Sequence, residues 1–77
     1  MDSRTQINQI IQKIAKRDEV PDPDESLFEA GWLDSFALPD VVSALEREFS
    51  IEIPDSDLNP RKFDTVARIA AYVDGRR

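Results

Sequence analysis

The chain has 77 residues, of which 40% are hydrophobic, and it contains neither histidine nor cysteine. Their absence excludes a disulfide framework, a thiolate nucleophile and the usual zinc sites, and it removes the commonest general base. A domain of this length also has little room for a catalytic cleft with supporting residues behind it. The composition therefore favours one small domain, residues 1–77, that binds or carries something and is not an enzyme.

The formal net charge of −6 is unevenly distributed along the chain. Residues 18–57 carry −12, whereas residues 1–17 and 58–77 carry +3 each. Because an acidic block repels phosphate backbones and anionic lipid headgroups, we expect basic protein partners and no nucleic acid. The N-terminus has no signal-peptide pattern and no apolar run reaches membrane-spanning length, which predicts a cytoplasmic protein without membrane insertion.

The first expected element is an amphipathic helix over about residues 3–17. Ser3 is a candidate for its N-terminal cap, and basic residues gather in its last turns, where they favour the helix dipole. A long loop follows, because Pro21 and Pro23 stop the helix. Its apolar residues are expected to pack on the bundle. The helix stripe comprises Ile7, Ile10, Ile11 and Ile14, and the apolar loop residues are Leu27, Phe28, Trp32 and Leu33.

A second amphipathic helix is expected to end at about Phe49, with Asp34 or Ser35 as its cap. Proline is tolerated only in the first turn of a helix. The position of Pro39 therefore predicts an irregular start around Ser35 to Leu38 and a regular helix from Pro39 onward. The inward stripe of this helix comprises Leu38, Val41, Val42, Leu45 and Phe49.

The remaining elements are short. An extended step at residues 51–54 leads to one helical turn over 55–59, and Asp64 or Thr65 caps a last helix that Gly75 ends. The stripe of this last helix comprises Val66, Ile69, Ala70 and Val73. Three amphipathic helices, one short helical turn and a long first loop predict an all-α fold, a small helical bundle.

The most informative stretch runs from Gly31 through Asp34 and Ser35 to Phe36, where the long loop enters the second helix. A serine at a helix N-terminus is most often only a cap. A helix N-terminus also offers unpaired N–H groups and the positive end of the helix dipole, which suit a phosphate ester on that serine. Both interpretations are compatible with the spacing alone.

Three stretches together resemble the acyl carrier protein family: Asp34-Ser35-Phe36, residues 27–31 upstream and residues 45–54 downstream. In that family an Asp-Ser-Leu sequence marks the serine that accepts 4′-phosphopantetheine from coenzyme A. The resemblance covers about residues 5–73 and implies a four-helix bundle with three main helices and one short one. It also implies that Ser35 is the attachment site and that Asp34 contacts the transferase.

The same resemblance implies that the protein itself catalyses nothing. A phosphopantetheinyl transferase would attach the arm, an acyl- or amino-acid-activating ligase would load cargo as a thioester, and a downstream enzyme would accept it. Residues 57–65 are similar to stand-alone D-alanyl and aminoacyl carrier proteins, whereas residues 51–54 and 66–68 are general carrier features. We therefore expect a discrete carrier, with fatty acyl, amino acid and polyketide cargo all left open.

Partner recognition is expected on the outward face of the second helix, because the inward stripe turns six other residues toward solvent. In carrier proteins this face docks basic patches on enzymes. Phe36 is either its apolar anchor or part of the core. Pro39 and Ser43 depart from the aliphatic residues frequent in fatty-acid carriers, so the enzymes of fatty-acid synthesis are expected to be poor partners. The six residues are Phe36, Pro39, Asp40, Ser43, Glu46 and Arg47.

Two alternatives complete the sequence-based expectations. The segment Asp22 to Ser26 resembles the start of a calcium loop, but Leu27 and Leu33 stand where the glycine and the bidentate glutamate are needed, so no metal site is predicted. The rival function is an unmodified acidic helical adaptor that binds a basic protein. Ser35→Ala separates the two, since it would abolish a carrier and spare an adaptor. We expect the protein to be a monomer.

Overall fold

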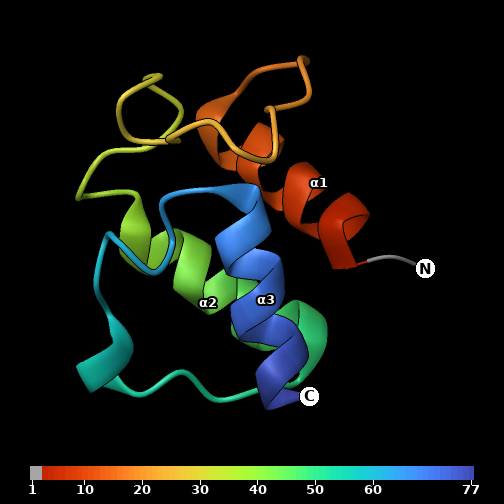
Figure 1. Ribbon diagram of the computed structural model, residues 1–77, viewed down its shortest axis with the longest axis vertical. Coiled ribbons are helices and arrows are strands. Elements are labelled where there is room, and N and C mark those ends of the chain that lie inside the picture. The colour runs from red at the N-terminus through yellow and green to blue at the C-terminus, as the bar shows by residue number, and fades with distance from the viewer. Residues whose placement is uncertain (1–2) are drawn as a thin grey trace.

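The computed structural model describes residues 3–77, which form three α-helices and one 3-10 turn (Figure 1). The described part of the chain contains no strand, which confirms the all-helical prediction. The helical turn predicted over 55–59 is a three-residue 3-10 turn and not an α-helix. In chain order the elements are α1 (Ser3–Ala15), α2 (Leu38–Phe49), η1 (Asp55–Asp57) and α3 (Val66–Arg76).

One hydrophobic core lies among the three helices, and α1 contacts both α2 and α3. The core also takes in Leu27 from the long loop and Phe63 from the segment before α3. The ring of Phe63 meets that of Tyr72 edge to face, with the ring centroids 5.3 Å apart. The side chains with no exposed surface are Ile7, Ile11, Leu27, Val41, Leu45, Phe63, Ile69 and Val73.

Helix α1 is shorter than predicted, because Lys16 adopts a left-handed conformation with a φ of 58°. The N–H of Arg17 then donates to the carbonyl of Gln12 at 3.0 Å, which is the hydrogen bond of a Schellman motif. The predicted cap role of Ser3 is wrong, since Ser3 is the first residue of the helix and is buried. Ile10 and Ile14 are only half-buried, in contrast to the other two isoleucines of the stripe.

Helix α2 begins as its proline predicts. Residues 35–37 form a turn, and the regular helix starts at Leu38 with Pro39 as its second residue. Ser50 ends the helix in a left-handed conformation with a φ of 55°, and the N–H of Ile51 donates to the carbonyl of Glu46 at 3.2 Å. This second Schellman motif turns the chain toward η1.

Thr65 is the cap of α3, because its hydroxyl accepts the N–H of Arg68 at 3.0 Å. Gly75 does not end the helix as predicted. It lies inside α3, and the N–H of Arg77 still donates to the carbonyl of Val73 at 3.1 Å. Among residues 3–77, no helix combines the length and apolar character needed to cross a membrane.

Candidate functional site

Ser35 lies at the junction where the long loop turns into α2. It is exposed to solvent, and its hydroxyl has no hydrogen-bond partner among residues 3–77. An exposed hydroxyl without a structural duty can accept a covalent group without loss of an internal contact. The sequence has no histidine that could activate this hydroxyl as a nucleophile.

Neither predicted residue caps α2, since the N-cap of this helix is Ala37 and no side chain makes a capping hydrogen bond there. The Asp34 carboxylate accepts the N–H of Ala37 at 2.8 Å, and the Asp34 carbonyl shares that N–H at 3.0 Å. This contact holds the turn of residues 35–37 against the start of α2. The prediction that Asp34 or Ser35 caps α2 is therefore wrong, because the irregular turn moves the start of the helix to Leu38. Asp34 stabilises that turn, and the neighbouring Ser35 side chain has no hydrogen-bond partner within residues 3–77.

The loop that leads to Ser35 is held to the segment just after α1 by contacts of Trp32 and Gly31 with Arg17. Trp32 is buried, its indole N–H donates to Glu25 at 3.0 Å, and the Arg17 guanidinium lies over its ring, 4.6 Å from the centroid. The same guanidinium donates to the carbonyl of Gly31 at 3.2 Å. Gly31 has a φ of 81°, a conformation that side chains rarely adopt, so a glycine is required for this turn.

A second set of contacts ties the loop to the start of α3. The N–H of Leu27 donates to the carbonyl of Asp64 at 2.6 Å, and the hydroxyl of Ser26 donates to the Asp64 carboxylate at 2.6 Å. The N–H of Ala67 donates to the carbonyl of Pro23 at 3.0 Å. Asp64, which the sequence offered as a helix cap, therefore positions the loop that carries the site.

The outward face predicted for α2 is largely exposed. The side chain of Phe36 is 88% exposed, which decides against a core position. Glu46 differs from the rest of the face, since it is half-buried and its carboxylate accepts the N–H of Ile53 at 3.0 Å. Its carboxylate thus holds the chain that follows α2. The exposed members are Phe36, in the turn before the helix, and Pro39, Asp40, Ser43 and Arg47 on α2.

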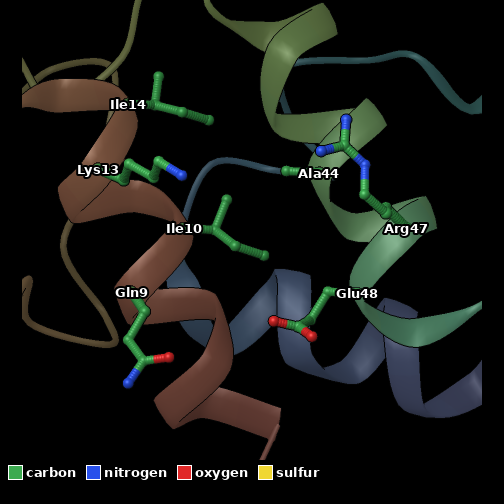
Figure 2. A pocket seen from close by; sticks show the side chains of 7 residues that line it. All are labelled: Gln9, Ile10, Lys13, Ile14, Ala44, Arg47 and Glu48. Carbon is green, nitrogen blue, oxygen red and sulfur yellow. The ribbon is translucent and has the colours of Figure 1, made fainter.

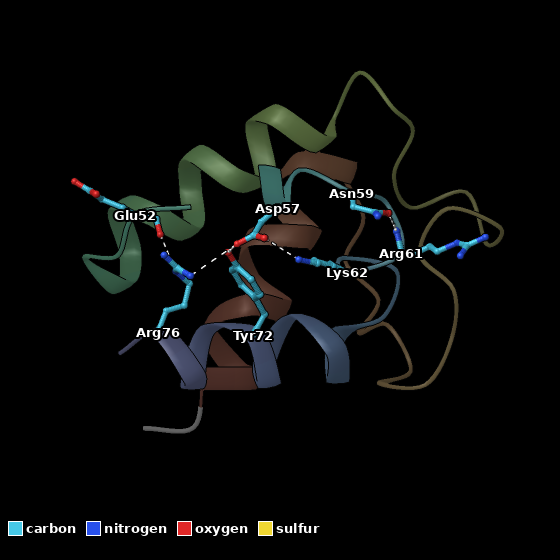
Figure 3. A network of polar contacts seen from close by, with 7 residues as sticks. All are labelled: Glu52, Asp57, Asn59, Arg61, Lys62, Tyr72 and Arg76. Atoms are coloured by element: carbon cyan, nitrogen blue, oxygen red, sulfur yellow. Dashed lines mark hydrogen bonds and ion pairs between the residues drawn. The ribbon is translucent and has the colours of Figure 1, made fainter. Parts of the chain in front are cut away.

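A polar network that the sequence analysis missed lies around Asp57, on the side of η1 that faces α3 (Figure 3). Its carboxylate accepts from Lys62 at 2.7 Å and from the Tyr72 hydroxyl at 2.5 Å, and Arg76 lies 3.8 Å away. The hydrogen bonds from Lys62 and Tyr72 lower the pKa of Asp57, whereas burial and the contact with Asp57 raise the pKa of Tyr72. The only signal for this network in the sequence is the i,i+4 spacing of Tyr72 and Arg76, which places both side chains on one face of the last helix.

The calcium-like segment has a structural explanation. The Asp22 carboxylate accepts the N–H of Asp24 at 2.9 Å, which forms a local turn in the long loop. Among residues 3–77 there is no group of three or more acidic side chains placed to hold a metal ion.

Comparison with known proteins identifies relatives along nearly the whole chain. Residues 5–73 match the family described as "Phosphopantetheine attachment site". The chain is 34% identical over 74 residues to the D-alanyl carrier protein of Leuconostoc mesenteroides, which covers 96% of this chain and 95% of that protein. It is 30% identical over 74 residues to the D-alanyl carrier protein of Lactobacillus acidophilus, with 96% and 94% covered, and 32% identical over 73 residues to that of Streptococcus sanguinis, with 95% and 92% covered.

Proposed function

The chain belongs to the family of phosphopantetheine attachment domains, and on that premise we propose that Ser35 is the residue that carries the arm. As a family member the protein is a carrier that bears 4′-phosphopantetheine on a serine, and its partners perform the catalysis. When bound, the arm supplies a terminal thiol that holds an acyl or aminoacyl group as a thioester. Transferases and ligases are therefore the expected classes of partner.

One observation carries the assignment to Ser35. Its hydroxyl is exposed and has no partner within residues 3–77, although it stands where a helix-capping side chain is expected. Because the Ser35 hydroxyl bonds to nothing within residues 3–77, a phosphodiester on it would displace no hydrogen bond there. The group would also lie at the N-terminal side of the turn and helix, where the helix dipole favours a negative charge.

Asp34 has a second role in the proposal. One of its oxygens is engaged by the N–H of Ala37, and the residue remains exposed beside the attachment hydroxyl. We place Asp34 in contact with the transferase or with the magnesium that such a transferase uses. The two roles are compatible because a carboxylate offers two oxygens to different partners.

The cargo that we propose is D-alanine, activated and loaded by a separate ligase. The support is that relatives at 30–34% identity, aligned over almost their whole length, are D-alanyl carrier proteins. The proposal includes a monomeric carrier of the acyl-carrier fold that is loaded in the cytoplasm, where coenzyme A is available as the source of the arm. Equal loading of D-alanine and fatty acids by their respective ligases would contradict the cargo assignment.

We assign partner docking to the exposed face of α2 beside Ser35. Phe36 offers an apolar side chain for a pocket on the partner, and Asp40 offers a charge to a basic patch. Pro39, Ser43 and Arg47 complete the face. Glu46 contributes indirectly, because its carboxylate accepts the N–H of Ile53 and holds the chain that follows α2. Single exposed charge pairs contribute only about 0–1 kcal/mol, which suits a carrier that has to leave each partner.

Labelling with a fluorescent coenzyme A analogue and a broad-specificity phosphopantetheinyl transferase tests the site. We expect stoichiometric labelling of the wild-type protein and of Ser56→Ala, a matched control with an exposed serine in η1, and none of Ser35→Ala. Labelling of a folded Ser35→Ala would overturn the assignment. Absence of labelling in all three proteins would favour the unmodified adaptor.

A further inference from the structure

Helix α1 carries two apolar stripes with different environments. Ile7 and Ile11 have no exposed surface, whereas Ile10 and Ile14 are only half-buried. The core covers the first stripe, and the second stripe faces an open groove between α1 and α2 with a volume of about 340 Å³. Half-exposed isoleucines beside a preformed groove are a feature of surfaces that bind another apolar segment.

The groove has an aliphatic floor. Figure 2 shows the side chains of Ile10 and Ile14 pointing from α1 toward α2, where Ala44 faces them. The small side chain of Ala44 leaves the space between the helices open. An incoming aliphatic side chain would thus contact both helices at once.

One end of the groove is basic, although the chain as a whole has a net charge of −6. Lys13 extends from α1 into the gap, and the Arg47 guanidinium lies beside Ala44 on α2 (Figure 2). Within residues 3–77, neither cation has an ion-pair or hydrogen-bond partner. The carboxylate of Glu48 lies farther along the groove, on the level of Gln9 (Figure 2). Charge therefore changes sign along the groove.

We propose that this groove binds an amphipathic helix of a partner protein, with aliphatic side chains on Ile10, Ile14 and Ala44 and carboxylates beside Lys13 and Arg47. Charge complementarity selects an acidic helix, because two unpaired cations flank the floor. Glu48 repels a carboxylate placed at the other end, which sets the direction of the bound helix. Helices that bind in this manner use residues spaced by three or four positions, and Ile10 and Ile14 have that same spacing on α1.

This surface is distinct from the Ser35 site and does not depend on the attached arm. Arg47 belongs both to the groove and to the docking face proposed above, so a variant at that position would not separate the two. Lys13 and the isoleucine methyl groups line the groove and lie outside the docking face, so the test relies on them.

The experiment selects helical peptides against the unmodified protein from a displayed library randomised at apolar and charged positions. We expect the recovered peptides to combine an aliphatic stripe with acidic residues. Lys13→Glu should weaken their binding about tenfold or more, since it replaces an attraction by a repulsion. Lys16→Glu makes the same charge change three residues away and outside the groove, and it should alter the affinity less than twofold.

A methyl NMR titration with a recovered peptide locates the binding surface. The Cδ1 signals of Ile10 and Ile14 should shift more than those of Ile7 and Ile11, which serve as internal controls on the same helix. The proposal would be overturned if the selection recovered no binder, or only basic peptides. It would also be overturned if the recovered peptides bound Lys13→Glu as well as wild type, or if the methyl shifts lay outside the groove. A dimer in sedimentation that Lys13→Glu abolishes would show that a second copy of the chain occupies the groove. Shifts of the Ile10 and Ile14 methyl signals when cargo is loaded on the arm would show that the cargo occupies it. Either result would overturn the proposal.

Discussion

At the residue scale, Asp34 and Ser35 have separate roles: Asp34 stabilises the turn into α2, and Ser35 is left available for modification. Asp34 bonds the N–H of Ala37 and stabilises the entry into α2, while the Ser35 hydroxyl stays unbonded within the described chain. A serine whose hydroxyl capped the helix would have to break that contact on modification. Because the two roles lie on different residues, we expect modification of Ser35 to leave the stability of the fold unchanged.

Substitutions at the two positions should therefore differ in stability. Asp34→Ala should lower the free energy of unfolding by about 0.5–1.5 kcal/mol, because it removes the hydrogen bond from the Ala37 N–H that holds the turn before α2. Ser35→Ala should change it by only a few tenths of a kcal/mol, within the usual range of surface substitutions. Urea unfolding followed by circular dichroism measures both values. A larger loss for Ser35→Ala than for Asp34→Ala would show that the serine is structural.

Sequence patterns could not assign these roles. Asp34 and Ser35 are both good capping residues, yet α2 begins at Leu38 with Ala37 as its N-cap. That start depends on how the preceding loop enters α2, which is set by Trp32 and Leu33 packing into the core. Phe36 was undecided for the same reason, since its direction follows from the turn and not from its spacing in the sequence.

The two glycines should respond to alanine with opposite signs. Gly75 lies inside α3 with open space around the position of a Cβ, so Gly75→Ala should stabilise by about 0.5–1 kcal/mol. Gly31 has a φ of 81°, and an added Cβ would lie 3.4 Å from the Arg17 guanidinium, so Gly31→Ala should destabilise by about 1 kcal/mol or more. Thermal melting of the two variants compares them, and changes of the same sign would contradict this account.

At the element scale, the periodicity of apolar residues predicted the three helices, and Pro39 predicted the irregular start of α2. Helix ends were predicted less well. Glycine is the usual stop signal, yet α1 and α2 end with Lys16 and Ser50 in left-handed conformations, and Gly75 lies within α3. The left-handed conformations direct the chain from each helix into the segment that follows it. That direction depends on how the segment packs on the rest of the fold, so a local sequence pattern does not predict it.

The half-burial of Ile10 and Ile14 has a similar cause. A helical stripe shows which side chains share a face, but not how much of that face the neighbouring helices cover. Helix α1 has α2 and α3 as neighbours, and together they leave the second stripe partly open. Glu46 was likewise predicted as outward because its bond to Ile53 depends on the turn after α2.

The contact between η1 and α3 should make stability depend on pH at both ends of the scale. Hydrogen bonds from Lys62 and Tyr72 lower the pKa of Asp57 in the folded state. Its contribution is therefore present above the unfolded pKa of about 4 and is lost as the pH falls through the folded value. Burial and Asp57 raise the pKa of Tyr72, so its contribution is present below about pH 10 and is lost as the pH rises through the folded value.

Unfolding free energies measured across pH check both limbs. Asp57→Asn should flatten the acid limb, and Tyr72→Phe should flatten the alkaline limb. Asp55→Asn is the matched control, since Asp55 is exposed in the same turn. An acid limb unchanged in Asp57→Asn would mean that other carboxylates determine it.

At the scale of the whole molecule, charge distribution governs how partners approach. The block of residues 18–57 carries −12, and most of its carboxylates are exposed. Such a field attracts basic enzymes over a distance set by the ionic strength, about 10 Å at 0.1 M salt. It contributes to the rate of association and little to the lifetime of the complex.

Asp40→Lys should therefore slow attachment of the arm several-fold at low salt, and the difference from wild type should shrink as salt is added. Glu52→Lys makes the same charge change at an exposed site after α2, away from the proposed docking face. Initial rates with one transferase across a salt series provide the comparison. Equal slowing by both substitutions would assign the effect to net charge and not to the α2 face.

The most direct test of the carrier assignment is the intact mass of the wild-type protein before and after incubation with coenzyme A, magnesium and a phosphopantetheinyl transferase. The account predicts the gain of one phosphopantetheine, which fragmentation places on Ser35. An unchanged mass in a folded protein, or an addition on any other residue, would contradict it.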